Sequence, residues 1–296
     1  TTDTYSAIYN QQRSDIMSNI DISASAKLVE LSIGLPSGRK KDVKQAEELN
    51  AKNNSDHVHN VTKSTLKGSV VLENAIKHGA QIRAEHTRMT LPYNNSGLRL
   101  VTNAMLVDYL AYMNDAEQEQ SEYRDKFLSE YPDIIANAPT VMGAAYKAED
   151  YPSYGVMADK FRWALEFYPV PSSGHFITDE ANEQVDEMMT QFETQQDARI
   201  QRAMGDVYGR VSKIMTRLSG QLEPDKKVYN SLIEGARELC DNIKSMNLTG
   251  DPQLEGIRQE LQKAMLGVDA VDIRSDDAYR KDVKTKVDDI LGKFNF

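Results

Sequence analysis

The longest hydrophobic pattern of the chain lies in its C-terminal part. From Val185 to Leu218, apolar residues recur at mostly three- and four-residue spacing over about ten turns, with one polar interruption at Gln196. A helix this long and amphipathic needs a partner along its length. Ser219-Gly220 should end it, and apolar positions at helical spacing return after Pro224. We therefore expect a long antiparallel helical hairpin, similar to a coiled coil. The stripe consists of Val185, Met189, Phe192, Ile200, Ala203, Val207, Val211, Ile214 and Leu218.

The N-terminal part mixes short strand patterns with helical ones. Residues 27–35 and 161–168 are rich in β-branched or aromatic residues and end at Gly or Pro, which favours strands. Between them, T-L-P-Y-N-N-S-G-L-R-L at residues 90–100 raises the choice between a hairpin and a ligand-binding loop. Asn and Gly tolerate positive φ, and Leu98 and Leu100 alternate with Arg99, so we expect a hairpin. These four strands predict one small antiparallel sheet.

Helical patterns fill most of the remaining chain. A loosely spaced polar helix is expected within residues 1–25, and Thr178, followed by two acids, is typical of the start of the long C-terminal helix. The pair Tyr131-Pro132 predicts the end of the helix that begins at Asn103. The other expected helices cover residues 42–50, 60–87, 136–148, 252–266 and 276–294. The fold class is therefore a predominantly helical α+β protein, with a mixed domain at residues 1–175 and a helical-hairpin domain at residues 176–296.

The composition of the chain argues against several classes of protein, namely those that bind nucleic acid, span a membrane or are secreted. The 296 residues are 40% hydrophobic and 27% charged, the net charge is -10 and the pI is about 5.1. This acidic balance opposes binding to nucleic acid. No apolar run reaches the roughly 20 residues of a membrane span. With Cys240 as the single cysteine and no signal-peptide pattern at the start, we expect a reducing, cytosolic location and no membrane contact.

One short motif suggests a metal site. The sequence D-I-S-A-S matches the D-x-S-x-S pattern with which von Willebrand A domains hold magnesium, and Asp21, Ser23 and Ser25 would supply hard oxygen ligands. That motif follows a buried apolar strand, whereas M-S-N-I precedes Asp21 here. Short patterns of common residues also arise by chance, so we favour an ordinary turn without a metal.

A basic stretch, S-G-R-K-K, lies between a predicted strand and a predicted helix. Arg39, Lys40 and Lys41 could bind a phosphate or the acidic face of a partner, helped by backbone N–H groups at a helix start. The stretch lacks the spacing of a nucleotide-binding loop, and a solvated basic turn is the simpler interpretation.

The remaining polar clusters have ordinary structural interpretations. The pair His57 and His59 would share a face only in a strand, and the preceding N-N-S-D favours a turn with solvated histidines. His78 and His86 lie about two turns apart on one helix, with no carboxylate at ligand spacing. The acidic residues 269–277 favour a helix-capping linker, and Cys240 a buried position. Met188, Met189, Met204 and Met215 are expected to fill the core.

Five motifs in order resemble the landmarks of DUF3150, an uncharacterised family of phage and prophage proteins. They are L-V-E-L-S-I-G-L-P-S-G-R-K, T-L-P-Y-N-N-S-G-L-R-L, Y-P-D-I-I, D-Y-P-S and F-Y-P-V-P-S, and they span about residues 27–176. The resemblance implies a phage-encoded protein, sometimes encoded near a MoxR-type AAA+ ATPase and a von Willebrand A-type protein. It implies no catalytic residues.

Three hypotheses follow from these observations. The first is a non-enzymatic interaction protein in the host cytoplasm, acting as an adaptor or client of the AAA+ ATPase and binding no cofactor. The second is a structural component of a virion or another ordered assembly, in which the helical hairpin mediates packing of copies into a homo-oligomer. The third, a metal-dependent enzyme, ranks last because the sequence contains no recognised catalytic motif.

Overall fold

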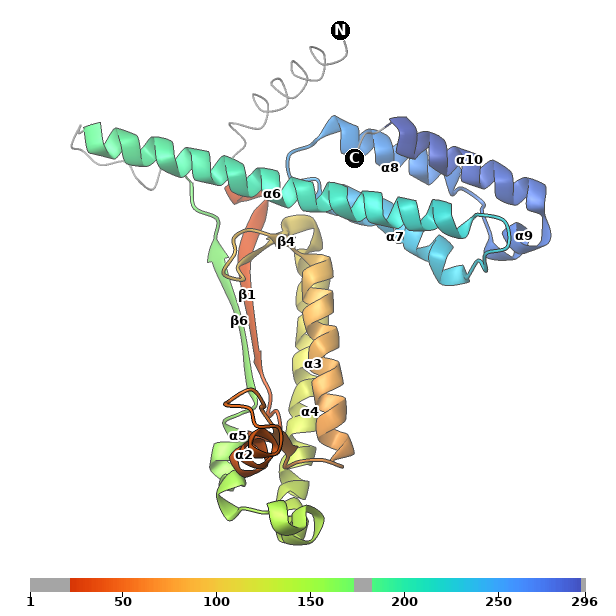
Figure 1. The fold of residues 1–296 in the computed structure, drawn as a ribbon. Coiled ribbons are helices and arrows are strands. Elements are labelled where there is room, and N and C mark those ends of the chain that lie inside the picture. Colours follow the sequence, from red (N-terminus) through yellow and green to blue (C-terminus); the bar gives the residue numbers. More distant parts are fainter. Residues whose placement is uncertain (1–21, 173–182, 294–296) are drawn as a thin grey trace. The chain divides into compact units, whose positions relative to one another are not determined.

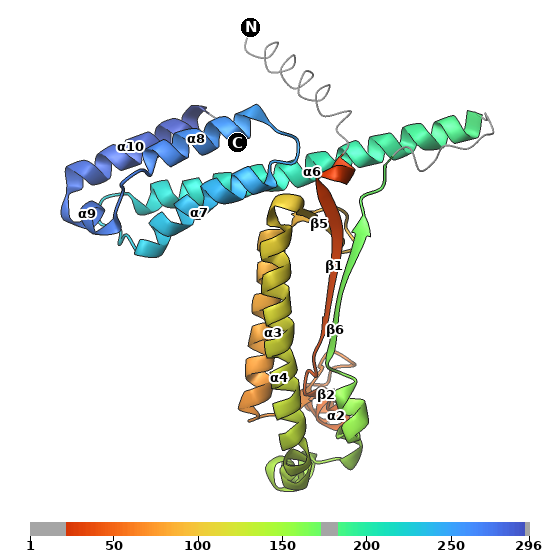
Figure 2. The ribbon, with the colours of Figure 1, turned by 180° about the vertical axis from the view of Figure 1, so that it is seen from behind.

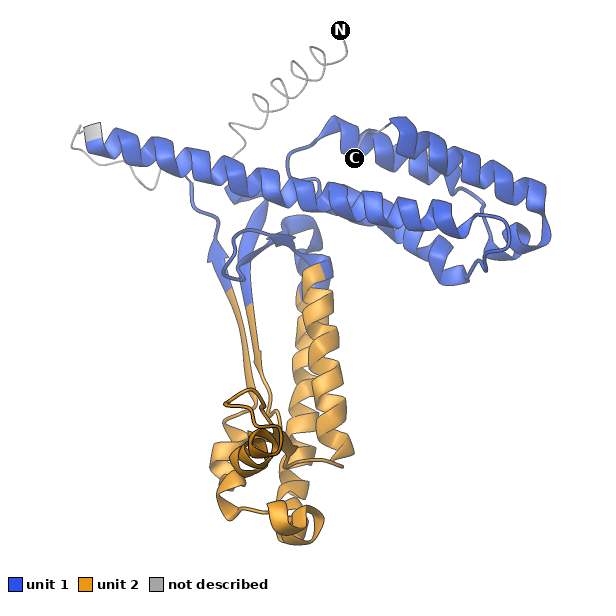
Figure 3. Cartoon of the chain, in the orientation of Figure 1, with its two compact units in different colours: residues 1–30, 88–109, 167–296 blue, residues 31–87, 110–166 orange. Residues whose placement is uncertain are grey.

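The computed structural model describes residues 22–172 and 183–293. The chain forms two compact units (Figure 3). Unit 1 contains Thr1–Glu30, Arg88–Tyr109 and Phe167–Phe296, and unit 2 contains Leu31–Thr87 and Leu110–Glu166. The units alternate along the sequence, whereas the predicted domains are consecutive. The predicted division at residue 175 is a statement about which segments fold independently. The compact units do not test independent folding, so this division stays a prediction.

The protein is a predominantly helical α+β protein with a small four-stranded antiparallel sheet towards its N-terminus, as predicted (Figure 1). In sheet order the strands are β4 (Leu91–Pro92), β5 (Arg99–Thr102), β1 (Ala26–Gly34) and β6 (Arg162–Pro169). β5 pairs antiparallel with both β1 and β4. All four correspond to the predicted strands. The β-branched and aromatic residues of β1 and β6, the alternation at Leu98 to Leu100 and the flanking Gly and Pro residues explain why the sequence revealed them.

The stretch at residues 90–100 forms a hairpin and not a ligand-binding loop. Leu91 pairs with Leu100, and Pro92 with Arg99. The connecting loop is closed by the Asn94 carboxamide, whose Oδ1 accepts hydrogen bonds from the backbone N–H groups of Ser96 (3.0 Å) and Leu98 (3.1 Å). Gly97 has φ +102°, which explains the glycine in the loop. The local sequence therefore determines this turn.

Unit 2 also contains a two-stranded antiparallel sheet that the sequence analysis did not predict. β2 (Arg39–Lys41) pairs with β3 (Thr62–Ser64). The prediction of a helix over residues 60–87 is therefore wrong at its start, because α3 (Val70–Met89) begins only after β3. The other elements preceding β6 are α2 (Val43–Lys52), α4 (Asn103–Met142), α5 (Tyr154–Ala158) and the 3-10 turns η2 (Gly143–Ala145) and η3 (Ala148–Asp150).

The predicted helix end at Tyr131-Pro132 is also wrong. α4 continues through Pro132 and Pro139 to Met142. Tertiary contacts hold the helix on both sides of Pro132. Phe127 and Tyr131 before it lie in the buried core of unit 2, and Ile134 and Ile135 after it pack against that core. The Tyr131 hydroxyl also donates a hydrogen bond to the carbonyl of Pro152 (2.8 Å). Packing therefore overrides the local preference of proline.

Replacing the interior proline should stabilise the protein. Proline within a helix costs about 3 kcal/mol relative to alanine, and relaxation of the surrounding turn recovers part of this cost. We expect Pro132→Ala to raise the free energy of unfolding by about 1–2 kcal/mol, measured by urea denaturation. Pro224→Ala, at an exposed position outside any helix, is the control and should change the free energy of unfolding by less than about 1 kcal/mol. A loss of stability in Pro132→Ala would contradict this interpretation.

Unit 1 contains the predicted helical hairpin. α6 (Glu183–Gln221) and α7 (Asn230–Met246) run antiparallel, side by side in Figures 1 and 2. The helix start predicted at Thr178, like the helix predicted at the chain start, falls outside the described residues. The remaining elements are η1 (Ile22–Ala24), α8 (Pro252–Ala264), α9 (Ala270–Ser275) and α10 (Asp277–Lys293). α8 and α10 match the two predicted C-terminal helices, whereas α9 was not predicted.

The helices α6 to α10 bury most of the predicted stripe. Ala203, Val207, Val211 and Leu218 are buried, and α6 packs against α7 and α10. Met204 and Met215 are also buried, as predicted. Met188 is 44% exposed and Met189 is only partly buried, so their expected place in the core is wrong. The packed part of α6 is thus its C-terminal half.

The acidic linker at residues 269–277 caps helices, as predicted. Asp269 Oδ1 accepts a hydrogen bond from the N–H of Val271 (2.7 Å) at the start of α9. Asp276 Oδ1 accepts one from the N–H of Tyr279 (3.0 Å) at the start of α10. Carboxylates here satisfy N–H groups that lack a partner within the helix and interact favourably with its dipole.

Cys240 is buried on α7, as predicted. Burial, followed by the nearby Asp241 carboxylate, raises the pKa of its thiol from 9.0 to about 11. Because the folded protein holds this proton more tightly than the unfolded chain, the resulting stabilisation is complete below pH 9. It is lost as the pH rises from 9 to 11.

The single thiol should therefore be unreactive in the folded protein. At pH 8 we expect Ellman's reagent to modify native Cys240 at least about a hundredfold more slowly than the urea-unfolded chain, because modification requires an exposed thiolate. One thiol per chain should react after unfolding. Rapid reaction of the native protein would show that the C-terminal helices open readily.

Candidate interaction site

The predicted metal site gains no support from the described residues. Asp21 lies outside them, Ser23 belongs to η1, and Ser25 is exposed immediately after it. Within residues 22–172 and 183–293, no group of three or more His, Cys, Asp and Glu side chains could hold a metal ion.

The histidines lie in polar surroundings. His57 is almost fully exposed, with Nε2 3.2 Å from the carboxylate of Asp56, as expected of a solvated turn. His59 Nε2 lies 2.9 Å from the amide nitrogen of Asn53. His78 contacts Gln120 and Glu119 on α4, and His86 is buried on α3.

The basic residues Arg39, Lys40 and Lys41 are exposed and precede the helix α2, as expected, but they form the strand β2, so the expected turn is wrong. Their backbone pairs with β3, opposite Ser64, Lys63 and Thr62. Arg39 and Lys40 line a cavity of about 40 Å³ together with Lys160, a residue that sequence analysis did not select. Lys41 does not line it.

A nearly buried ion pair lies next to Arg39 and Lys40, because its acidic member, Asp150, lines the same cavity. Lys63 Nζ is 2.6 Å from Asp150 Oδ2, and the two side chains are only 9% and 13% exposed. Lys63 Nζ also donates a hydrogen bond to the carbonyl of Ala145 (2.7 Å). This pair joins β3 to the segment after α4 and so holds the basic strands in place.

The polar interruption in the stripe of α6 has a structural role. Gln196 Oε1 accepts hydrogen bonds from the Tyr93 hydroxyl (2.8 Å) and from Arg199 Nη1 (3.0 Å), and its Nε2 donates to the carbonyl of Pro171 (2.7 Å). The Arg199 guanidinium lies over the Tyr93 ring, 4.9 Å from its centroid. Arg202 Nη1 also donates to Asn95 Oδ1 (2.9 Å). The 90–100 hairpin is thus anchored to the middle of α6.

A second set of bonds strengthens this anchor. Arg210 on α6 donates to the carbonyls of Arg88 (2.6 Å) and Thr90 (2.8 Å), and its Nη2 pairs with Asp206 (2.7 Å). Arg99 Nε donates to the Thr90 hydroxyl (2.6 Å). Burial and the nearby Arg210 charge lower the pKa of Arg99. Arg210 therefore fixes α6 to the end of α3 and to Thr90 before β4, and Arg99 on β5 holds Thr90 from the other strand of the hairpin.

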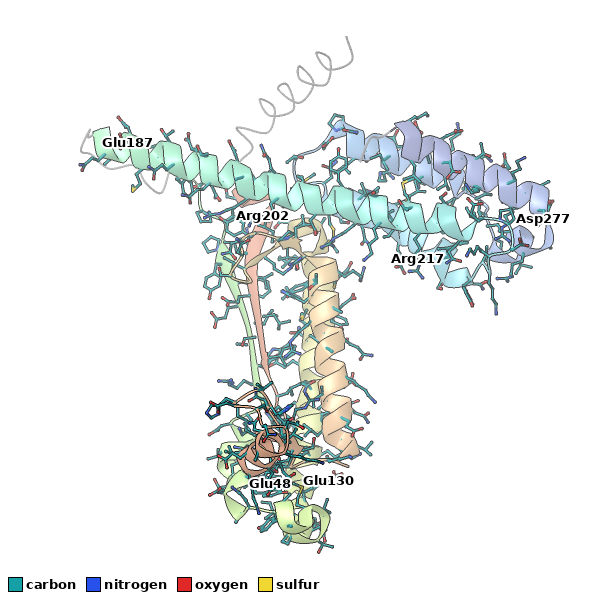
Figure 4. All side chains as sticks on the ribbon, viewed as in Figure 1. Glu48, Glu130, Glu187, Arg202, Arg217 and Asp277 are labelled. Atoms are coloured by element: carbon teal, nitrogen blue, oxygen red, sulfur yellow. The ribbon has the colours of Figure 1, made fainter. Side chains whose placement is uncertain are left out.

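The part of α6 that precedes Ile200 presents an apolar stripe that lacks full burial. No side chain in residues 184–199 is buried, and Ile200 is the first buried residue of the helix. Val185, Met189 and Phe192 are partly exposed on one face, and Met188 is exposed beside them. Figure 4 labels Glu187 on this segment and Arg202 after it. We name residues 184–199 the N-terminal segment of α6.

The charge of this segment is strongly negative. It holds four acidic residues and one basic residue, Arg199. Burial and the neighbouring Glu193 carboxylate raise the pKa of Asp197. An apolar stripe flanked by carboxylates on a firmly anchored helix is the arrangement by which a helix binds a complementary groove or helix. The N-terminal segment of α6 is therefore the candidate interaction site.

Comparison of the chain with protein families, curated proteins and solved structures gave no match. The resemblance to DUF3150 stays an expectation from the sequence. No helix within residues 22–172 and 183–293 combines the length and the apolar character needed to cross a membrane.

Proposed function

We propose that this protein is a non-enzymatic adaptor that binds a protein partner through the N-terminal segment of α6. The observation that supports this most is the contrast within one helix. From Ile200 onwards every residue of the apolar stripe except the partly buried Ile214 is buried, and α6 packs there against α7, α10 and the hairpin, whereas before Ile200 no residue of the stripe is buried. Such a stripe is costly to leave in water and is typical of a binding surface.

The charges of the segment define the chemistry of its partner. Carboxylates at Asp186, Glu187 and Glu193 surround the stripe, so the complementary surface is an apolar groove or helix flanked by Lys and Arg. Electrostatic complementarity of this kind accelerates encounter and selects against acidic partners.

The anchor through Gln196, Arg199 and Arg210 favours binding at low entropic cost. Gln196 and Arg199 fix the last turn of the segment and Arg210 fixes the helix beyond it, so the partner meets a helix whose direction is already set. Preorganisation of this kind raises affinity by reducing the ordering that binding requires.

We propose that the partner is a MoxR-type AAA+ ATPase and that the complex forms in the cytoplasm of a phage-infected host. The resemblance to DUF3150 supports this assignment, since such ATPases are sometimes encoded nearby. The protein would act as the adaptor or client of that ATPase and would need no cofactor of its own.

Co-purification tests the assignment. Tagged full-length protein should capture the ATPase encoded nearest its gene, with different yields in the presence and absence of ATP. Mass spectrometry of purified phage particles is the second arm. Absence of capture under both conditions would contradict the adaptor role, and many copies of the chain in each particle would favour a structural role instead.

A further inference from the structure

A small cavity in unit 2 is separate from the α6 segment. Its volume is about 70 Å³, and one wall consists of α4 residues at helical spacing, including Gln120, Ser121 and Arg124. The other walls come from the end of β1 and the start of β6, including Arg162 and Trp163. The fold thus gathers two guanidinium groups, a hydroxyl and a carboxamide around one space.

The side chain of Gln120 is the feature of this cavity that indicates a ligand. Its side chain is buried, and Oε1 lies 3.0 Å from Nδ1 of His78. The other imidazole nitrogen, Nε2, is 3.2 Å from the Glu119 carboxylate, which holds the ring in place. The amide nitrogen Nε2 of Gln120 is buried, and the described part of the chain offers it no hydrogen-bond acceptor. A buried donor of this kind calls for an acceptor from outside the chain.

The guanidinium groups make the surroundings of this donor positive. Arg162 is exposed, and within the described residues its guanidinium has no hydrogen-bond or ion-pair partner. It lies close to Gly34, where an added Cβ would be only 2.9 Å from Arg162 Nε. The absence of a side chain at Gly34 therefore lets Arg162 lie against the end of β1. Arg124 pairs through Nε with Asp125 (2.8 Å).

We propose that this cavity binds a carboxylate group. Its volume matches about two water molecules, the size of a single carboxylate with its first carbon. The fork of Arg162 would bind the carboxylate, and a small movement of the Gln120 side chain would let its buried Nε2 donate a hydrogen bond to one carboxylate oxygen. Glu117 also lines the cavity and is exposed, so its charge disfavours the dianion of phosphate relative to a monoanion.

The single tryptophan of the chain makes the proposal measurable. Trp163 lines the cavity, so its fluorescence reports on occupancy without a label. The full-length protein would be titrated with sodium acetate at constant ionic strength, with acetamide and inorganic phosphate as comparison probes. We expect a saturable change with acetate, none with acetamide, and weaker binding of phosphate.

Variants connect the signal to the cavity. Gln120→Leu should weaken acetate binding at least about tenfold, since the buried donor is lost. Arg162→Gln should do the same, and because Arg162 is exposed its replacement leaves the fold intact. Gln118→Leu, an exposed change on the same helix, should bind acetate like the wild type. Thermal unfolding of each variant confirms that it is folded.

Two further probes distinguish the origin of the carboxylate. N-acetylglycine represents the C-terminus of a chain, and propionate an acidic side chain. If N-acetylglycine binds more tightly than propionate, the natural ligand is the C-terminus of a chain. If propionate binds at least as tightly, the natural ligand is an acidic side chain. A fluorescence response that is not saturable, that is equal for acetamide, or that persists in both Gln120→Leu and Arg162→Gln would overturn the proposal.

Discussion

The double variant Val185→Glu/Met189→Glu should lose at least about tenfold in affinity for the ATPase while keeping the stability of the wild type. Both side chains belong to the partly exposed stripe of the N-terminal segment of α6. Burying one aliphatic side chain is worth about 1.5–3 kcal/mol, so losing two anchors outweighs a tenfold change in affinity. Glutamate forms helix readily, and neither position is buried in the free protein, so the fold should be unaffected.

A matched control separates the loss of apolar contact from the added charge. Gln191→Glu/Thr194→Glu adds the same two charges to exposed positions of the same segment, away from the stripe. We expect this control to bind within about threefold of the wild type, because charges at the rim of an interface contribute little affinity. Isothermal titration calorimetry measures both variants. Equal losses in the two would attribute the effect to charge and contradict a role for the stripe.

The second large effect should come from the ion pair of unit 2. Lys63→Met should lower the free energy of unfolding by about 3–5 kcal/mol, because it leaves the Asp150 carboxylate in a mostly buried position without its cation. The change also removes the hydrogen bond to the carbonyl of Ala145. Urea denaturation followed by circular dichroism measures the loss.

The double variant Lys63→Met/Asp150→Asn tests the cause. If the unpaired charge dominates, removing it should recover at least about half of the loss. Lys147→Met, which removes an exposed lysine 3.8 Å from Glu149, is the control and should cost less than about 0.5 kcal/mol. A Lys63→Met protein as stable as the wild type would show that the pair contributes nothing.

The sequence revealed those parts of the fold in which local preference and tertiary structure agree. The 90–100 hairpin was predictable because Asn94 and Gly97 specify its turn within a few residues. By contrast, β2 and β3 are three polar residues each, with no hydrophobic alternation to reveal them. The continuation of α4 past Pro132 was not predictable because contacts with residues far away in sequence hold the helix together.

The candidate sites show the same division. The apolar stripe of α6 was visible in the sequence, but its period is the same before and after Ile200. Only the fold shows which part is buried. Gln196 appeared as an interruption of the stripe, and its role as the anchor of Tyr93 depends on a contact across 103 positions. The cavity around Gln120 was not predictable, because its walls come from three segments that only the fold brings together.

Hydrogen exchange of the full-length protein, with and without the ATPase, tests the central claim most directly. If the N-terminal segment of α6 is the binding surface, its amides should exchange at least about tenfold more slowly in the complex, because binding suppresses local opening of the helix. The amides of α7 to α10 should keep their exchange rates. Slowed exchange confined to other segments, with residues 184–199 unchanged in a saturated complex, would contradict the claim.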